Sequence, residues 1–258
     1  MLLPTAEGNL SEIYFPLTAN PAGYNHLLLA ENVLWQFPET RLLVFILSNG
    51  RHPDPFKTVQ IPHASLRYEI LRSALLEWSD PENSLPARYA DESKILLKLG
   101  RNNCAISRRE LSFSSPLRLA DHVRYFSTDQ KIALIVGADL IQRMLDPRIF
   151  TDTDLAQIES GCLLIAAPRD DIDLKKTLQL IKQKRGLKLS VIQITPIMLP
   201  KKLQKFYQIS STHIRKATQA GHSLETFLPE NAALHISQYC LYRSWKQNTD
   251  SNLSLIHI

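Results

Sequence analysis

The chain has 258 residues, of which 44% are hydrophobic and 21% charged, so it can bury a substantial core. With 8 Gly, 15 Pro and no run of 18 apolar residues, this composition excludes the collagen-like, disordered and membrane-spanning classes. The net charge of +5 is compatible with a nucleotide partner or with weak nucleic-acid contact, and it selects neither.

Neither the N-terminus nor the cysteines indicate an exported protein. Met-Leu-Leu-Pro is too short and uncharged to be a signal peptide, and we expect a cytoplasmic protein. Cys104, Cys162 and Cys240 lie far apart without a C-x-x-C pair, which argues against a disulfide framework and a structural zinc. The basic run 175–205 favours a solvated helix face over a nucleic-acid surface, and the chain has no run of 18 apolar residues, so we expect no nucleic-acid and no membrane partner.

The first elements follow a β-α-β order. Apolar residues at 13–15 predict a strand that enters the turn-rich segment 20–23. Helical spacing of apolar residues from His26 predicts a helix that Pro38 stops. The continuous apolar run 41–48 is typical of a strand buried on both faces of a parallel sheet.

The same alternation continues to residue 194. A helix is expected at 66–78, an insertion at 79–103, and a helix from Asp173 to Arg185 that Gly186 ends. Three further short apolar strands each end in a loop, at 132–136, 162–166 and 189–194. The fold class is therefore α/β, a doubly wound parallel sheet with ligands expected at the carboxyl ends of its strands.

Residues 209–215, Ile-Ser-Ser-Thr-His-Ile-Arg, carry the most informative pattern. Ser and Thr before a helix offer N-caps while free backbone N–H groups point outward, which suits an anion. Arg215 would add a forked cation for phosphate oxygens. An ordinary capped surface helix is the alternative.

This segment resembles the I-S-S-T-x-I-R signature of the nicotinate and nicotinamide mononucleotide adenylyltransferases. Upstream, Ile135-Val136-Gly137-Ala138-Asp139 resembles the family's I-I-G-A-D strand end. The resemblance covers about 13–242, leaving the 79–103 insertion and the tail aside. Further residues that resemble the family are Gly221-His-Ser-Leu224, Leu228-Pro229, Tyr239-Cys-Leu-Tyr242, Arg67 on a helix and Lys57 in the preceding loop.

An N-terminal motif of the same superfamily, G-x-F-x-P-x-H/T-x-G-H, is degraded in this chain. The corresponding residues are 17–26, in which Asn20, Pro21 and the final His26 stand. The first His or Thr of the motif is Gly23, and its Gly is Asn25. One of the two side chains expected around the triphosphate is therefore absent.

The resemblance implies a Rossmann-like nucleotidyltransferase fold that moves AMP from ATP to nicotinate or nicotinamide mononucleotide with release of pyrophosphate, in NAD biosynthesis. It implies a core at 1–200 and a C-terminal phosphate-binding helical segment of the same domain at 201–245. The polar composition of 246–258 predicts a flexible tail. The site residues that the resemblance implies are His26 and Arg215 as catalytic groups, and Thr18, Asn20, His26, Gly137, Asp139, Ser211, Thr212 and Arg215 for ATP.

Within that site, the resemblance gives His26 the α-phosphate and Asp139 the ribose hydroxyls. Lys57, Ser115 and Phe150 would contact the mononucleotide, although the family's Tyr-Thr and stacking Trp have no clear counterpart. Helix capping remains an alternative for His26 and Asp139, and simple solvation for Lys57.

The expected partners are ATP, with Mg²⁺ carried by its phosphates, and a pyridine mononucleotide; no protein metal site is expected, and a homo-oligomer is left open. Two alternatives remain: a nucleotide-binding protein of this fold with reduced or no catalysis, and a nucleotidyltransferase with a different acceptor. Gly23 and Asn25 favour the non-catalytic alternative, whereas Ser211, Thr212 and Arg215 oppose it.

Overall fold

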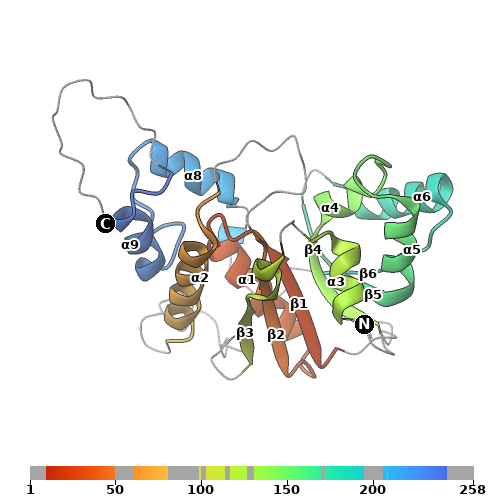
Figure 1. Cartoon of the computed structure of the whole chain (residues 1–258), viewed down its shortest axis with the longest axis horizontal. Coiled ribbons are helices and arrows are strands. Elements are labelled where there is room, and N and C mark those ends of the chain that lie inside the picture. Colours follow the sequence, from red (N-terminus) through yellow and green to blue (C-terminus); the bar gives the residue numbers. More distant parts are fainter. Residues whose placement is uncertain are drawn as a thin grey trace.

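The fold is built on a six-stranded parallel sheet with strand order β3-β2-β1-β4-β5-β6 (Figure 1). The structure is a computed structural model, and it describes residues 10–49, 61–80, 99, 103–113, 117–126, 131–169, 172–194, 206–207 and 209–242. The strands are β1 (Glu12–Leu17), β2 (Leu42–Leu47), β3 (Cys104–Ser107), β4 (Ile132–Gly137), β5 (Cys162–Ala167) and β6 (Ser190–Gln193).

The strand order reverses beside β1. From β1 the chain moves outward through β2 to β3, then returns to pair β4 with β1 and moves outward the other way. In a doubly wound sheet this reversal opens a crevice at the carboxyl ends of the two central strands. The expected fold class is confirmed, and the segments after β1 and β4 lie where a ligand is expected.

Helices cover both faces of the sheet and form two cores. In β4, Ala133 and Ile135 pack into one core, while Leu134 and Val136 pack into the other, as the period of two in a strand requires. The first core lies under α1 (Tyr24–Gln36), α2 (Ala64–Trp78), α8 (Ser211–Gln219) and α9 (Glu230–Gln238); the second lies under α3 (Leu119–Phe126), α4 (Ala138–Arg143), α5 (Asp152–Gly161) and α6 (Leu174–Arg185).

Strand β1 continues through Pro16, beyond the expected end at residue 15. A proline inside a central strand normally leaves a gap in the ladder of hydrogen bonds. Here the recorded register of β1 with β4 covers only Ile13 and Tyr14, whereas the register with β2 continues to Leu17. Pro16 therefore lies where the sheet has separated on one side of β1, which is also where a pocket opens.

The expected helix ends on the second half of the chain are confirmed. The Asp173 carboxylate accepts the Lys176 N–H at the start of α6. Gly186 ends α6 in the left-handed region at φ 69°, a conformation that glycine adopts without a Cβ penalty. In the first half, α1 begins at Tyr24, two residues before the expected start, because its N-cap is Gly23.

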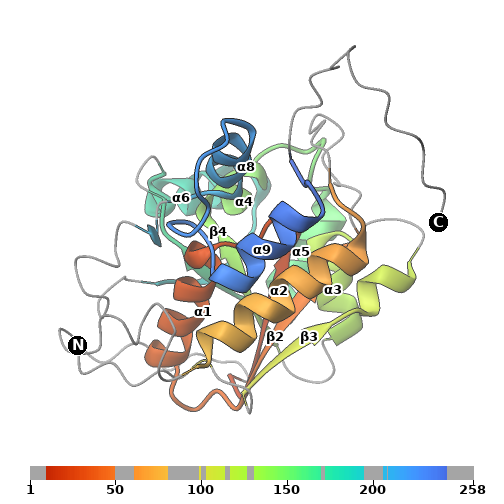
Figure 2. The same ribbon diagram turned by 90° about the vertical axis from the view of Figure 1, so that its left-hand side faces the viewer.

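The C-terminal helices pack on the sheet domain. Figure 2 shows α9 lying along α2, as it also does in Figure 1. The Glu77 carboxylate accepts the N–H groups of Glu230 and Asn231, both at 2.8 Å, and so caps the start of α9. A hydrogen bond of 3.0 Å joins Ser73 Oγ and His235 Nε2. An acceptor at the positive end of a helix stabilises it, so α2 holds α9 in place.

Two expected segments fall largely outside the described residues. Of the 79–103 insertion, the structure describes 79–80, 99 and 103, and the tail 246–258 is outside it. The domain limits therefore stay predictions. Within the described residues, no helix is both long enough and apolar enough to cross a bilayer.

Candidate functional site

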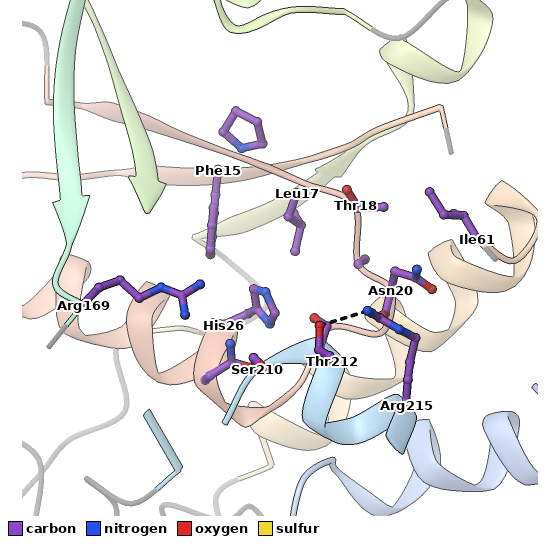
Figure 3. A pocket seen from close by; sticks show the side chains of 14 residues that line it. Phe15, Leu17, Thr18, Asn20, His26, Ile61, Arg169, Ser210, Thr212 and Arg215 are labelled. Carbon is purple, nitrogen blue, oxygen red and sulfur yellow. Dashed lines mark hydrogen bonds between the residues drawn. The ribbon is translucent and has the colours of Figure 1, made fainter. Parts of the chain in front are cut away.

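A pocket of about 320 Å³ lies at the carboxyl end of β1. This volume is at the lower end of the range for small-molecule sites. The start of α1, the start of α8 and the segment after β5 supply most of its polar side chains. Its described lining is Phe15, Pro16, Leu17, Thr18, Ala19, Asn20, Asn25, His26, Ile61, Arg169, Ser210, Ser211, Thr212 and Arg215 (Figure 3).

The first turn of α8 faces this pocket. Ser210 is the N-cap, and its side chain accepts the His213 N–H at 3.3 Å. The N–H groups of Ser211 and Thr212 precede the first intrahelical hydrogen bond of α8, which Ile214 makes to the Ser210 carbonyl. Unsatisfied N–H groups and the helix dipole together favour an anion at this point. The expected anion-binding start of the helix therefore borders the pocket.

Side chains of α8 bind it to the loop after β1. Arg215 Nη1 donates to the Asn20 carbonyl at 2.7 Å, and its Nη2 donates to Thr212 Oγ1 at 3.0 Å. Ser211 Oγ donates to the Pro21 carbonyl at 2.8 Å. The bonds to the Asn20 and Pro21 carbonyls join residues 190 or more apart in sequence. The structure thus brings Thr18, Asn20, Ser211, Thr212 and Arg215 together, as the sequence predicted for an ATP site.

His26 lies in the first turn of α1, with its half-buried ring in the pocket wall. Its Nδ1 accepts the Gly23 N–H at 3.2 Å, so in the neutral ring the proton is on Nε2. Burial lowers the pKa of His26 from 6.5 to about 4, and the charge of Arg169 acts in the same direction. The ring is therefore neutral near pH 7 and can donate through Nε2 alone.

Gly23 occupies a place where a side chain does not fit. A Cβ there would lie 2.5 Å from Ile214 Cδ1 and 3.1 Å from the Phe227 carbonyl oxygen. The backbone at Gly23 is extended, with φ −100°, so the requirement for glycine is steric and not conformational. Helix α8 therefore packs into the space that a histidine at this motif position would need.

Arg67 ties the segment after β1, which lines the pocket, to the segments after β2 and before α2. The residue is fully buried, and its guanidinium donates to the carbonyls of Thr18 at 2.6 Å, Ser48 at 2.8 Å and Pro62 at 2.9 Å. A buried cation is tolerated when its donors are satisfied. The sequence placed Arg67 on a helix but carried no signal for this role, since the three carbonyls come from separate loops.

Arg169 is a lining residue that the sequence analysis did not select. It follows β5, and its Nε lies 3.7 Å from Asp139 Oδ1. The Asp139 carboxylate also lies over Gly137, where a Cβ would be 2.2 Å from its Oδ1. Asp139 and Gly137 are therefore beside the pocket, although neither is among its described lining residues. The signal for Arg169 was its position just after a predicted buried strand.

The expected mononucleotide residues are not brought together in the described part of the chain. Phe150 is 5% exposed in the second core, and its carbonyl accepts Arg185 Nη2 at 2.8 Å. Its ring has no open face for stacking, so the expectation for Phe150 is corrected: it is a core residue. Lys57 and Ser115 lie outside the described residues.

The described residues contain no group of three or more His, Cys, Asp or Glu side chains that could hold a metal ion. The described lining of the pocket has hydroxyl, amide, imidazole and guanidinium groups but no carboxylate. Such a donor set suits phosphate oxygens better than Mg²⁺, which prefers oxygen ligands.

Comparisons with known proteins find similar sequences and similar folds. No family model matches the chain. It is 25% identical over 226 residues, 87% of this chain and 93% of the relative, to a probable nicotinate-nucleotide adenylyltransferase of Synechococcus sp. (strain JA-2-3B'a(2-13)). The Plasmodium falciparum nicotinic acid mononucleotide adenylyltransferase complexed with APC superposes with a TM-score of 0.58 at 14% identity, covering 90% of this chain and 96% of that one. The same enzyme complexed with NaAD gives 0.54, also at 14% identity, and covers the same share of both chains.

Proposed function

We propose that this chain is an adenylyltransferase that moves AMP from ATP to nicotinate or nicotinamide mononucleotide, releasing pyrophosphate. The observation that carries the proposal is the first turn of α8, with Ser211, Thr212 and Arg215, facing a pocket at the carboxyl end of β1. The similarity to a probable nicotinate-nucleotide adenylyltransferase over most of both chains supports the choice of reaction. In the proposed pathway, the product enters NAD biosynthesis.

The reaction needs no nucleophile from the protein. A phosphate oxygen of the mononucleotide attacks the α-phosphorus of ATP, that P–O bond forms, and the bond from the α-phosphorus to the bridging oxygen breaks as pyrophosphate leaves. The attacking phosphate is already an anion at neutral pH. Catalysis therefore consists of holding the two substrates in line and stabilising charge in the transition state.

We assign the triphosphate to α8. The hydroxyls of Ser211 and Thr212, the N–H groups of the first turn and Arg215 would hold the β- and γ-phosphates. Arg215 is pre-oriented for this by its bonds to the Asn20 carbonyl and Thr212 Oγ1. A guanidinium held in this way loses less conformational entropy when the ligand binds.

His26 is assigned to the α-phosphate. Its bond from the Gly23 N–H leaves Nε2–H as the donor. Because burial lowers its pKa to about 4, the ring would donate a hydrogen bond as a neutral imidazole near pH 7 and would not accept a proton from a substrate. The role is charge stabilisation by a hydrogen bond, and not proton transfer.

The remaining substrate groups are assigned from the resemblance. Asp139 would accept from the ribose hydroxyls of ATP, and Lys57 and Ser115 would contact the mononucleotide. Mg²⁺ would enter with ATP, held by phosphate oxygens and water, and it would supply neutralisation of the phosphate charge.

A second candidate is a nucleotide-binding protein of the same fold with little or no catalysis. Gly23 is the observation that favours it, because the motif's first His or Thr is missing and Ile214 of α8 occupies its space. The two candidates make the same prediction for ATP binding and opposite predictions for pyrophosphate release.

The experiment is an assay of pyrophosphate release by the purified chain with ATP and Mg²⁺. Nicotinate mononucleotide, nicotinamide mononucleotide and no acceptor are compared in separate reactions, and ATP binding is measured calorimetrically alongside. Release that depends on one pyridine mononucleotide supports the transferase. ATP binding without release in any reaction would contradict it and leave the binding protein or another acceptor.

A further inference from the structure

Arg169 differs from the arginines that support the fold. Arg67 is fully buried with its donors on backbone carbonyls, and Arg185 is 8% exposed with bonds to two carbonyls and to Asp152. The Arg169 side chain is 51% exposed, and its recorded ion pair with Asp139 is long, at 3.7 Å. A pair of this length and exposure contributes little to stability. The stability of the fold therefore does not explain the position of Arg169.

The position of Arg169 points to an anionic ligand. Among the described residues that line the pocket, the charged side chains are Arg169 and Arg215. Figure 3 shows them entering from opposite sides with His26 between them, and the Arg169 side chain extending toward His26. The His26 ring, toward which Arg169 extends, is neutral near pH 7. Among the described lining residues, Arg169 is therefore the one that places a positive charge at this end of the pocket.

The partner of Arg169 is the residue assigned to the ribose. Asp139 is 41% exposed at the start of α4, beside the carboxyl end of β4. While the two are paired, the pair partly neutralises a cation at the pocket and occupies an acceptor beside it. A phosphate group binds a guanidinium through charge-assisted hydrogen bonds, which are stronger than an exposed ion pair.

We propose that Arg169 binds the phosphates of the nucleotide, and that nucleotide binding exchanges its ion pair with Asp139 for this contact, which frees Asp139 for the ribose hydroxyls. The inference rests on the proposed function for the identity of the nucleotide. It adds a phosphate ligand from β5 to those of α8, and it couples binding of the phosphates to binding of the ribose.

The test measures binding and not turnover. The full chain is titrated calorimetrically with ATP, with adenosine, which lacks phosphates, and with tripolyphosphate, which lacks the ribose, all in the presence of Mg²⁺. The variants are Arg169→Gln, Asp139→Asn and the two together. Arg148→Gln is the matched control, because Arg148 forms an exposed pair with Asp146 at 2.7 Å and does not line the pocket. Thermal melting confirms that each variant is folded.

The expected result for Arg169→Gln is a loss of about 10- to 100-fold in affinity for ATP and tripolyphosphate, with adenosine binding unchanged within about twofold. Asp139→Asn is expected to weaken adenosine binding about tenfold and to strengthen tripolyphosphate binding. That gain is expected to shrink when residue 169 is Gln, because there is then no guanidinium to release.

Four results would overturn the inference. Unchanged tripolyphosphate affinity in Arg169→Gln would show that Arg169 does not contact the phosphates. Equal losses of affinity for ATP and adenosine in the same variant would mean that Arg169 only positions Asp139. If Asp139→Asn changes tripolyphosphate affinity equally with Arg or Gln at residue 169, no ion pair is exchanged when the phosphates bind. Failure of the parent chain to bind ATP overturns this inference and the proposed function together. If Arg169→Gln weakens ATP binding but the parent chain releases no pyrophosphate, the proposed function is contradicted and this inference stands.

Discussion

Two segments approach the pocket, and they differ in how they keep the features of a phosphate site. The start of α8 retains its hydroxyls, free N–H groups and Arg215, whereas the β1–α1 segment has Gly23 and Asn25 at two motif positions and keeps His26 of the two side chains expected around the triphosphate. The two segments are also in contact, since Arg215 and Ser211 donate to the carbonyls of Asn20 and Pro21. A motif position lost in the β1–α1 segment has therefore been filled by packing from α8.

His26 gives the largest expected effect, because it is the motif's remaining side chain in the poorer segment. If it donates to the α-phosphate in the transition state, His26→Ala lowers kcat on the order of a hundredfold or more. Single-turnover and steady-state kinetics measure this. His222→Ala, an exposed histidine after α8, is the control and should leave kcat unchanged. Equal kcat for His26→Ala and the parent would show that α8 alone suffices.

Arg215 tests the richer segment. Arg215→Ala is expected to weaken ATP binding by about 1.5 to 3 kcal/mol, because it removes charge-assisted contacts. Arg215→Lys keeps the charge but loses the fork, so its ATP affinity should lie between those of the parent and the alanine variant. The control is Lys216→Ala, which removes one exposed charge from the next position of α8. Equal losses for Arg215→Ala and Lys216→Ala would contradict a specific phosphate contact.

Gly23→His tests whether packing has replaced the lost side chain. Because a Cβ at residue 23 would meet Ile214 at 2.5 Å, the substitution is expected to destabilise the fold by roughly 1 to 3 kcal/mol and not to raise activity. Urea unfolding measures the change in free energy. Combining Gly23→Ala with Ile214→Val should cost less than the sum of the single changes, since the smaller residue 214 gives space. A stable and more active Gly23→His variant would overturn this account.

The pH dependence of stability tests the environment of the His26 ring. Burial lowers the pKa of His26 to about 4 in the folded protein, so between pH 6.5 and 4 the unfolded state binds more protons. The contribution of the neutral ring is therefore present above pH 6.5 and is lost as the pH falls toward 4. As the pH falls from 6.5 to 4, the Tm of His26→Gln should therefore fall less steeply than the Tm of the parent. Parallel curves would show that the ring is not desolvated in the folded state.

The sequence alone determined the parts of this protein that depend on neighbours along the chain. Alternating apolar strands and periodic helices predicted the parallel sheet, and Asp173 and Gly186 predicted the ends of α6. Ser210 and the residues after it predicted a helix start suited to anions, because an N-cap and its free N–H groups lie within one turn. The family resemblance then supplied the reaction and most of the candidate ATP residues.

The tertiary structure alone decided which residues meet at the pocket and which are buried. Arg169 lines it because β5 ends at the same edge of the sheet as β1, and Arg67 closes on three carbonyls that no local pattern relates. Phe150 was expected to bind the pyridine ring but is buried in the second core. These outcomes depend on contacts between segments far apart in sequence, and an apolar or charged side chain carries no local mark of whether it will face a core or a ligand.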